Sequence, residues 1–230
     1  MESADVLIVG AGPAGTTAAY GLARRGHDVL VVEEHARVGH PVQCAGLVSE
    51  RVLDLAGSRA MVRTAVVGAT VFSPSLKPVP FRAAEPRAFV IDRAGLDVEL
   101  AGRAARAGAR IETGMRFDSV ARPDGGTVKV RLVDPQGATV EVATRLVVGA
   151  DGVSSPVARA FHLRRPVEIL PAFEAEFPRS PGDPDQVEIY LGNDLSPGLF
   201  GWWIPDGGGG ARVGVAARAG STSARAYFDR

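Results

Sequence analysis

A glycine-rich turn near the start of the chain constrains the fold more than any other feature of the sequence. Gly10, Gly12 and Gly15 form the pattern G-x-G-x-x-G directly after an apolar run at residues 6–9. In a turn from a buried strand into a helix, the first glycine permits a sharp bend and the second lets the backbone approach a pyrophosphate. The third lets helix and strand pack closely. The pattern therefore predicts a strand, turn and helix of a parallel α/β sheet.

A carboxylate follows where a nucleotide ribose would need one. A second apolar run at residues 29–32 ends in Glu33, ~20 residues beyond the turn. An acidic side chain there can accept hydrogen bonds from both hydroxyls of an adenosine ribose. Strand, turn, helix, second strand and acid thus occur in the order of a dinucleotide-binding unit. This signature does not by itself separate NAD from FAD.

The composition argues against several other classes of protein. The sequence is 46% hydrophobic and 23% charged, which is ordinary for a globular protein. A formal net charge of zero argues against nucleic-acid binding and against a polybasic membrane anchor. One cysteine and four histidines without ligand spacing indicate neither disulfides nor a metal site. No apolar stretch approaches the ~20 residues of a membrane span. The start does not read as a signal peptide, so we expect a cytoplasmic protein.

Three residues admit both a structural and a functional interpretation. Cys44 lies in a turn of small residues, where a backbone can approach a flat ring, but alone it would be read as a buried apolar residue. Arg93 opens a predicted helix, where its charge opposes the helix dipole, so either a bound anion or solvent should accompany it. Asp151 ends an apolar strand, where open α/β sheets bind ligands, or it caps the following helix.

The rest of the chain reads mostly as β structure. An antiparallel meander is predicted at 117–121, 127–133 and 139–143, and further antiparallel strands at 169–177, 186–191, 201–204 and 212–216. Phe200, Trp202 and Trp203 cluster in the last part, either as core aromatics or as walls of a cavity. Alternation along a strand directs the two tryptophans to opposite faces, so at most one can face a given cavity.

Several of these motifs occur together in one known family. The glycine turn with Glu33, the segment RAGLDVEL at 93–100 and the segment GADGVSSPVAR at 149–159 resemble the FAD-dependent fold of aromatic hydroxylases and geranylgeranyl reductases. PVQCAGLVS at 41–49 resembles the cysteine-containing loop beside the flavin in the reductases. FGWWIP at 200–205, with GVA at 214–216, resembles their Y-x-W-x-x-P…G-x-G substrate-cavity motif, with Phe in place of Tyr and Ala in place of the last Gly.

The resemblance implies an α/β fold with two domains. A Rossmann-like FAD-binding domain with a parallel sheet would comprise residues 1–60 and 88–164, and an antiparallel β substrate domain residues 61–87 and 165–220. The residues that it places at FAD are Gly10, Gly12, Ala14, Gly15, Glu33, Arg37, Cys44, Ala45, Gly46, Arg93, Phe117 (through its backbone) and Asp151. Those that it places at the substrate cavity are Phe200, Trp202, Pro205 and Gly214.

The implied function is reduction of C=C bonds in geranylgeranyl or other isoprenoid chains of a lipid, quinone or pigment precursor. Cys44 would donate a proton or tune the flavin. The sequence has no second G-x-G-x-x-G, so electrons would come from docking NADPH, a ferredoxin or a reduced deazaflavin. A lipid substrate would bring the protein to a membrane surface as a peripheral protein.

Two alternatives stay open. An FAD-dependent aromatic hydroxylase shares the glycine turn and the motifs of Arg93 and Asp151, but it does not account for the cysteine loop or for residues 202–205. The other alternative is a non-catalytic FAD-binding fragment. The family continues into a further strand and a G-D motif that this sequence does not reach before Arg230, so we expect a truncated chain.

Overall fold

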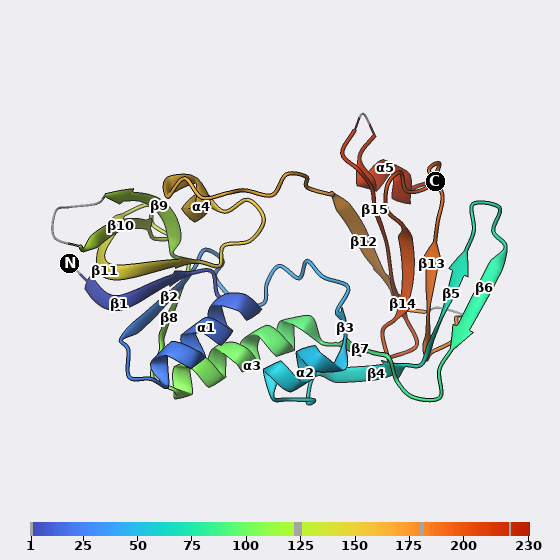
Figure 1. Cartoon of the computed structure of the whole chain (residues 1–230), viewed down its shortest axis with the longest axis horizontal. Coiled ribbons are helices and arrows are strands. Elements are labelled where there is room, and N and C mark those ends of the chain that lie inside the picture. Colours follow the sequence, from blue (N-terminus) through green and yellow to red (C-terminus); the bar gives the residue numbers. More distant parts are fainter. Residues whose placement is uncertain (1, 122–125, 180–181, 221) are drawn as a thin grey trace. The chain divides into compact units, whose positions relative to one another are not determined.

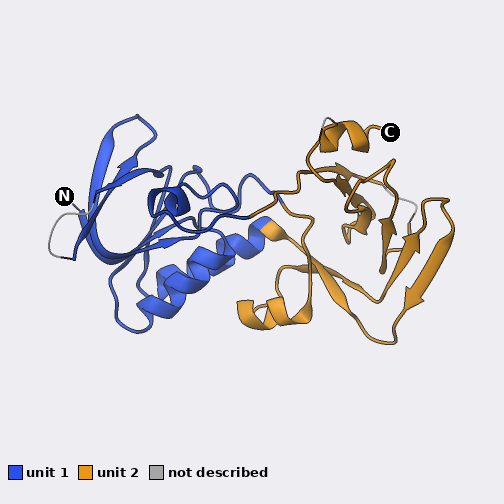
Figure 2. Ribbon diagram, turned by 45° about the horizontal axis from the view of Figure 1, so that its top comes forward, with its two compact units in different colours: residues 1–43, 94–166 blue, residues 44–93, 167–230 orange. Residues whose placement is uncertain are grey.

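The backbone forms two compact units, each built from two separate stretches of chain. The structure is a computed structural model that describes residues 2–121, 126–179, 182–220 and 222–230 (Figure 1). Unit 1 comprises residues 1–43 and 94–166, and unit 2 comprises residues 44–93 and 167–230 (Figure 2).

Unit 1 contains a six-stranded mixed sheet in the order β8-β2-β1-β11-β10-β9. Strands β8, β2, β1 and β11 are parallel, and β10 and β9 continue the sheet antiparallel. The strands are β1 (Glu2–Val9), β2 (Val29–Glu33), β8 (Arg110–Thr113), β9 (Arg116–Ala121), β10 (Val128–Val133) and β11 (Thr139–Gly149). The helices are α1 (Pro13–Ala23), α3 (Arg93–Arg106, whose first residue belongs to unit 2) and α4 (Pro156–Ala160).

The central strands of unit 1 are apolar without alternation because both of their faces are covered. On β1 and β2, Ile8 and Val31 pack with alanines of α1 and α3, whereas Leu7 and Leu30 pack with residues of β10 and β11 on the other face. All four of these side chains are fully buried. Continuous apolar runs are expected for parallel strands that are covered on both faces. The runs at residues 6–9 and 29–32, on either side of the glycine turn and helix, have this pattern.

One predicted boundary in unit 1 was wrong. The sequence suggested a meander strand at 139–143 and a separate apolar strand that ends at Asp151, but β11 is continuous over Thr139–Gly149. The polar pair between the two runs does not break the strand. Thr144 is buried, and its hydroxyl donates to the carbonyls of Asp5 (3.1 Å) and Leu146 (3.0 Å), while Arg145 is exposed. The strand can therefore pair with β1 and β10 together.

Unit 2 contains two sheets. The larger has the order β12-β15-β14-β13-β5-β6 and is antiparallel except for the parallel pair β13 and β5. Its strands are β5 (Gly68–Phe72), β6 (Pro78–Arg82), β12 (Ala172–Phe177), β13 (Gln186–Tyr190), β14 (Gly201–Pro205) and β15 (Ala211–Ala216). The smaller sheet has the order β3-β7-β4, with β3 (Leu47–Val48), β4 (Val62–Val66) and β7 (Ala88–Ile91). The helices are α2 (Glu50–Ala56) and α5 (Ala224–Phe228).

The two sheets of unit 2 share an apolar core. Val66 and Val90 of the small sheet pack with Val187 and Ile204 of the large one, and all four are buried. Residues 44–60 and 88–93, which the resemblance places in the FAD-binding domain, thus pack within unit 2. The reason is that β7 pairs with both β3 and β4 through long-range antiparallel ladders.

A matched pair of alanine substitutions on α1 tests the tight packing of the glycine turn. A Cβ on Gly15 would lie 1.9 Å from the carbonyl oxygen of Gly10, whereas a Cβ on Gly21 has no neighbour closer than 3.6 Å. We expect Gly15→Ala to lower the free energy of unfolding by about 1–3 kcal/mol through overpacking. Gly21→Ala should raise it by up to about 1 kcal/mol through helix propensity. Urea unfolding measures both, and equal effects would contradict this account of the turn.

Candidate functional site

The glycine turn combines two glycines that the protein itself requires with one that it does not. Gly10 has φ of +103°, and a Cβ there would lie 2.3 Å from the carbonyl oxygen of Ala150. Gly12 is the N-cap of α1, has an ordinary φ of −70°, and has no atom within 4 Å of the position of a Cβ. No steric contact in the folded chain therefore requires a glycine at position 12, and the space beside it suits a ligand.

The start of α1 is suited to an anion. The helix has no side-chain cap at Gly12, and its first turn carries no acidic residue. Ala14, the second helical residue, is exposed. Uncapped N–H groups and the helix dipole give such an end a positive partial charge, which is the environment that a pyrophosphate requires.

Glu33 lies beside the same turn. Its Oε2 accepts a hydrogen bond from the Ala11 N–H at 2.8 Å, and its Oε1 accepts from the His35 N–H at 3.1 Å. The His35 Nδ1 atom lies 2.6 Å from Oε1 as well. These contacts fix the carboxylate at the carboxyl end of β2, next to the glycine turn. His35 was not predicted from the sequence. Its only signal there is its position two residues after Glu33.

The side chain of Asp151 stabilises a helix. One carboxylate oxygen accepts from the Ser155 hydroxyl at 2.6 Å, and the other accepts from the Val157 N–H at 2.9 Å. The helix-cap interpretation thus describes what this side chain does in unit 1. Its backbone nevertheless lies next to the glycine turn, because a Cβ on Gly10 would be 3.1 Å from the Asp151 nitrogen.

The remaining residues expected at FAD have less defined environments. Arg37 is exposed in the loop after β2. Phe117 is 4% exposed and packs in the core of unit 1, so that only its backbone can face a ligand. Arg93 is the first residue of α3 and belongs to unit 2.

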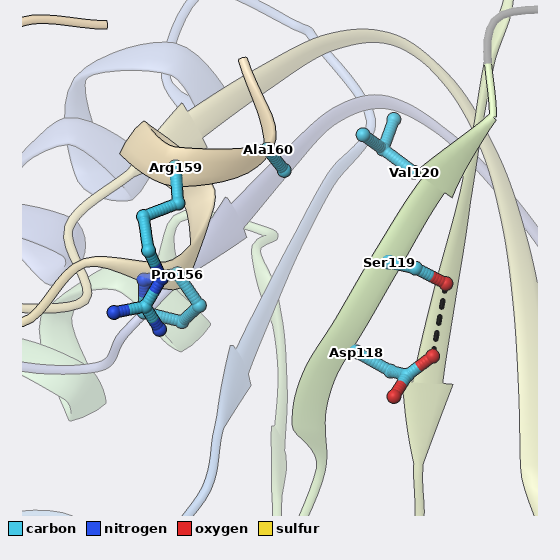
Figure 3. A pocket seen from close by; sticks show the side chains of 6 residues that line it. All are labelled: Asp118, Ser119, Val120, Pro156, Arg159 and Ala160. Carbon is cyan, nitrogen blue, oxygen red and sulfur yellow. Dashed lines mark hydrogen bonds between the residues drawn. The ribbon is translucent and has the colours of Figure 1, made fainter. Parts of the chain in front are cut away.

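Unit 1 also has a polar pocket that the sequence did not predict. It has a volume of about 400 Å³ and lies between β9 and α4, as Figure 3 shows. It is lined by Asp118, Ser119, Val120, Pro156, Arg159 and Ala160. The Ser119 hydroxyl donates to Asp118 at 2.9 Å across one wall. None of the residues predicted at the flavin or the substrate lines this pocket.

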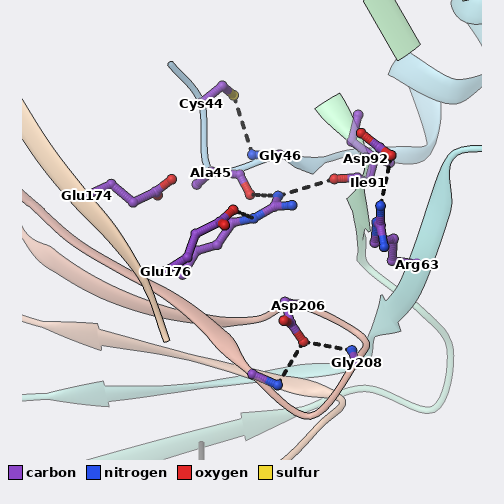
Figure 4. A network of polar contacts seen from close by, with 12 residues as sticks. Cys44, Ala45, Gly46, Arg63, Ile91, Asp92, Glu174, Glu176, Asp206 and Gly208 are labelled. Carbon is purple, nitrogen blue, oxygen red and sulfur yellow. Dashed lines mark hydrogen bonds and ion pairs between the residues drawn. The ribbon is translucent and has the colours of Figure 1, made fainter. Parts of the chain in front are cut away.

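In unit 2, the cysteine loop (residues 44–46) is held by hydrogen bonds. The half-buried Cys44 Sγ accepts from the Gly46 N–H at 3.4 Å. The carbonyl of Ala45 accepts from Nη1 of Arg212 at 2.6 Å, and the same nitrogen donates to the Ile91 carbonyl at 3.2 Å (Figure 4). Arg212 is on β15, far from the loop in sequence, and was not predicted.

Trp202 lies on the large sheet of unit 2, opposite Gly214. A Cβ on Gly214 would lie 2.3 Å from the indole Cζ2, so the glycine makes room for the ring. Phe200 contacts the indole edge-to-face with ring centroids 6.3 Å apart, and Pro205 is buried at the end of β14. Trp202 packs in the same apolar cluster as Ala45. The two segments that resemble the reductases, remote in sequence, therefore border the same apolar cluster of unit 2.

The other tryptophan is directed elsewhere. A Cβ on Gly182 would lie 2.2 Å from the ring of Trp203. Since Trp203 pairs with Val213 and Trp202 with Gly214, neighbouring positions on β15, the two rings lie on opposite faces of the sheet. This agrees with the alternation expected from the sequence.

A half-buried carboxyl group lies beside Trp202. Glu174 on β12 accepts a hydrogen bond from Nε1–H of Trp202 at 2.8 Å, and its side chain extends toward the cysteine loop (Figure 4). Burial raises the pKa of Glu174, although the Trp202 hydrogen bond and the charge of Arg212 act in the opposite direction. The sequence FEAEF contained a signal for this position, since its alternation places two carboxylates on one face of a strand.

The features above define a class of protein: a dinucleotide-binding α/β unit that shares its chain with an antiparallel β unit and a cysteine loop. The sequence profile of the FAD binding domain family matches residues 3–199. The chain belongs to this family, and FAD is its cofactor, as the resemblance implied. The residues fit FAD, because the uncapped start of α1 has open space at Gly12 and the carboxylate of Glu33 is fixed beside it.

Individual relatives give a consistent result. The digeranylgeranylglycerophospholipid reductase 2 of Methanothermobacter thermautotrophicus is 34% identical over 98% of this chain and 61% of the relative. The digeranylgeranylglycerophospholipid reductase of Methanocaldococcus jannaschii is also 34% identical, over 98% of this chain and 58% of the relative. The chain therefore spans about three fifths of the length of these proteins.

Solved structures agree with the fold. The crystal structure of a geranylgeranyl bacteriochlorophyll reductase-like protein from Thermoplasma acidophilum matches with a TM-score of 0.89 and 30% identity, over 100% of this chain and 61% of that one. The p-nitrophenol 4-monooxygenase of Pseudomonas putida matches with a TM-score of 0.76 at 16% identity, which shows the shared fold alone. The predicted fold class, the FAD cofactor and the resemblance to geranylgeranyl reductases are thus confirmed.

The pKa of Glu174 leads to a prediction about stability. Because folding disfavours the ionised carboxylate, the unfolded chain loses this proton at lower pH, and the group lowers the free energy of unfolding as pH rises from its unfolded pKa to its folded pKa. Gln can still accept from Trp202 but cannot ionise. We expect Glu174→Gln to gain stability relative to wild type on going from acidic to neutral pH.

Urea unfolding at both pH values measures this difference. Glu85→Gln is the matched control, because Glu85 is exposed in the same unit. A difference between Glu174→Gln and wild type that is the same at acidic and neutral pH would contradict the prediction.

Proposed function

We propose that the chain is the FAD-binding and substrate-binding part of a reductase that saturates C=C bonds in geranylgeranyl chains. The observation that carries this proposal is that Ala45 of the cysteine loop and Trp202 pack against the same apolar cluster of unit 2, since these two segments separate the reductases from the hydroxylases. The two curated relatives at 34% identity are named as reductases of digeranylgeranylglycerophospholipids, which favours a prenylated glycerophospholipid over a quinone or pigment precursor. The solved structure at 30% identity is named as geranylgeranyl bacteriochlorophyll reductase-like.

The proposed FAD-binding residues follow from unit 1 and from the family resemblance. The N–H groups of Ala14 and Gly15 would face the pyrophosphate across the open space at Gly12, and Glu33 would accept from the ribose hydroxyls. The backbone at Phe117 would meet the adenine. Arg37, Asp151 and Arg93 would lie around the cofactor, with Arg93 as a cationic contact. From unit 2, the cysteine loop would lie against the flavin ring.

The proposed reaction depends mainly on the positioning of the isoprenoid chain. FAD, when bound and reduced, supplies a hydride for one carbon of the double bond. An isolated alkene develops no oxyanion that hydrogen-bond donors could stabilise, so apolar walls that orient the chain and exclude water should contribute most. Phe200 and Trp202, with the backbone at Pro205 and Gly214, would form such a wall. Cys44 is the proposed source of the proton for the second carbon, held at Sγ.

Electron supply and location are further parts of the proposal. NADPH, a ferredoxin or a reduced deazaflavin would reduce the flavin. Among the described residues, no helix is long and apolar enough to cross a bilayer. We propose that the protein acts in the cytoplasm and meets its lipid substrate as a peripheral protein at the membrane surface.

The direct test uses the purified chain with FAD. A bound-flavin absorption spectrum, followed by anaerobic reduction and incubation with a digeranylgeranyl glycerophospholipid, should give products heavier by two hydrogens for each double bond reduced, measured by mass spectrometry. A protein that stays colourless with added FAD would show that this chain alone is not an enzyme. Oxygen consumption with NADPH and a phenol, without lipid reduction, would instead indicate a hydroxylase.

Gly12→Ala separates FAD binding from folding. Because a Cβ at position 12 meets no protein atom, the variant should fold, with a stability loss of about 1 kcal/mol from the poorer helix N-cap. The methyl group would occupy the space assigned to the pyrophosphate, so we expect FAD affinity to fall about tenfold or more, equivalent to about 1.4 kcal/mol. Fluorescence titration with FAD measures the affinity, and Gly21→Ala is the control on the same helix. Unchanged affinity would place the pyrophosphate elsewhere.

Cys44→Ala tests the proposed proton donor. Loss of a general acid should lower turnover by about 100-fold, within the usual range for such groups, while FAD affinity changes little. Single-turnover oxidation of the reduced flavin by the lipid measures the rate. Unchanged turnover and product pattern would leave Cys44 as a packing residue only.

A further inference from the structure

Arg212 is a buried charge that the proposed chemistry does not use. It lies on β15 and is 9% exposed, which places its guanidinium in the interior of unit 2. Its ionic partner is Glu176 on β12, with 3.5 Å between Nε and Oε1, and the side chain of that glutamate is 78% exposed. A charge is retained at such a site only where hydrogen bonds replace its hydration.

The hydrogen bonds of Arg212 go to the backbone around the cysteine loop. Nη1 donates to the Ala45 carbonyl at 2.6 Å and to the Ile91 carbonyl at 3.2 Å. One nitrogen therefore joins the loop, the end of β7 and the large sheet. Within the cysteine loop, these hydrogen bonds reach Ala45, the residue after Cys44, and neither of them goes to the thiol.

The loop is shaped to receive this side chain. Gly46 has φ of +71°, and a Cβ there would lie 2.5 Å from Nη1 of Arg212 and 2.8 Å from the Ile91 carbonyl oxygen. Glycine is thus needed both for the backbone conformation and for the approach of the guanidinium. The Cys44 Sγ accepts from the N–H of this same glycine, which links the thiol to the position of Arg212.

Hydrogen bonds and close packing hold the hairpin that carries Arg212 in place. It lies on a hairpin of β14 and β15, which also carries Trp202 and is closed by a turn in which Oδ1 of Asp206 accepts from the N–H groups of Gly208 (2.6 Å) and Gly210 (2.9 Å). The turn packs closely on β4, since a Cβ on Gly207 would lie 2.9 Å from the backbone of Arg63. Figure 4 shows the loop, Glu176 and this turn together.

We propose that Arg212 is a positioning residue, which fixes the cysteine loop on the sheet that carries Trp202 and thereby sets the position of the Cys44 thiol. Its importance for catalysis rests on the proposed function, but the link between Arg212 and Cys44 does not. The chain has one cysteine, so the rate of labelling by a thiol reagent reports on this loop alone.

The test measures labelling by the disulfide reagent DTNB in the native chain, with and without FAD. Arg212→Met should release the loop and accelerate labelling by about tenfold, because local opening and exposure control thiol reactivity. Arg212→Lys, which keeps the charge on a single ammonium, should give an intermediate rate. Glu176→Gln and Arg218→Met should stay within about twofold of wild type, because the first keeps the carbonyl contacts and Arg218 is an exposed cation paired with Glu168.

Folding of each variant is checked by circular dichroism. If Arg212→Met does not fold, Arg212→Lys replaces it, and a smaller acceleration is expected because the ammonium keeps the charge but not the guanidinium geometry. Wild-type labelling in a folded Arg212→Met variant, or in Arg212→Lys where it replaces that variant, would overturn the proposal. Absence of lipid reduction by the wild type, with accelerated labelling in the variants, would sink the proposed function and leave the role of Arg212 intact.

Discussion

The close approach of three backbone segments at the glycine turn is the interaction on which unit 1 depends. The carbonyl of Gly10 occupies the place where a side chain of Gly15 would begin, and the carbonyl of Ala150 does the same for Gly10. β1, α1 and the end of β11 therefore meet without intervening side chains. The same compactness brings the uncapped start of α1 and the carboxylate of Glu33 to one edge of the sheet, so the demands of packing and of FAD binding are met by a single stretch of chain.

Much of unit 1 could be predicted because its signals are local. Apolar runs, glycines and the acid at residue 33 identify β1, α1 and β2 without knowledge of any distant residue. Unit 2 depends on long-range pairing: β13 joins β5 in parallel, and β7 joins β3 to β4. Such pairings leave no periodic trace in the sequence, so the packing of residues 44–60 and 88–93 in unit 2 could not be predicted from it.

The candidate site shows the same division. The resemblance selected the cysteine loop and Trp202, but Glu174, which accepts from Trp202, and Arg212, which donates to the loop, belong to no motif of the family. A lone charge in a strand usually faces solvent, and only its register against a neighbouring strand reveals that it faces inward. Asp151 is the opposite case: it belongs to a recognised motif, but its side chain caps a helix.

The division of each unit between two stretches of chain has a consequence for biosynthesis. The chain leaves one unit for the other after residues 43, 93 and 166, so neither unit is encoded by a continuous segment. On a ribosome, β1 and β2 emerge long before β11, which must pair with β1 to complete the sheet of unit 1. Until then the edges of these apolar strands lack their partner, and unpaired strand edges of this kind are the surfaces that chaperones protect during synthesis.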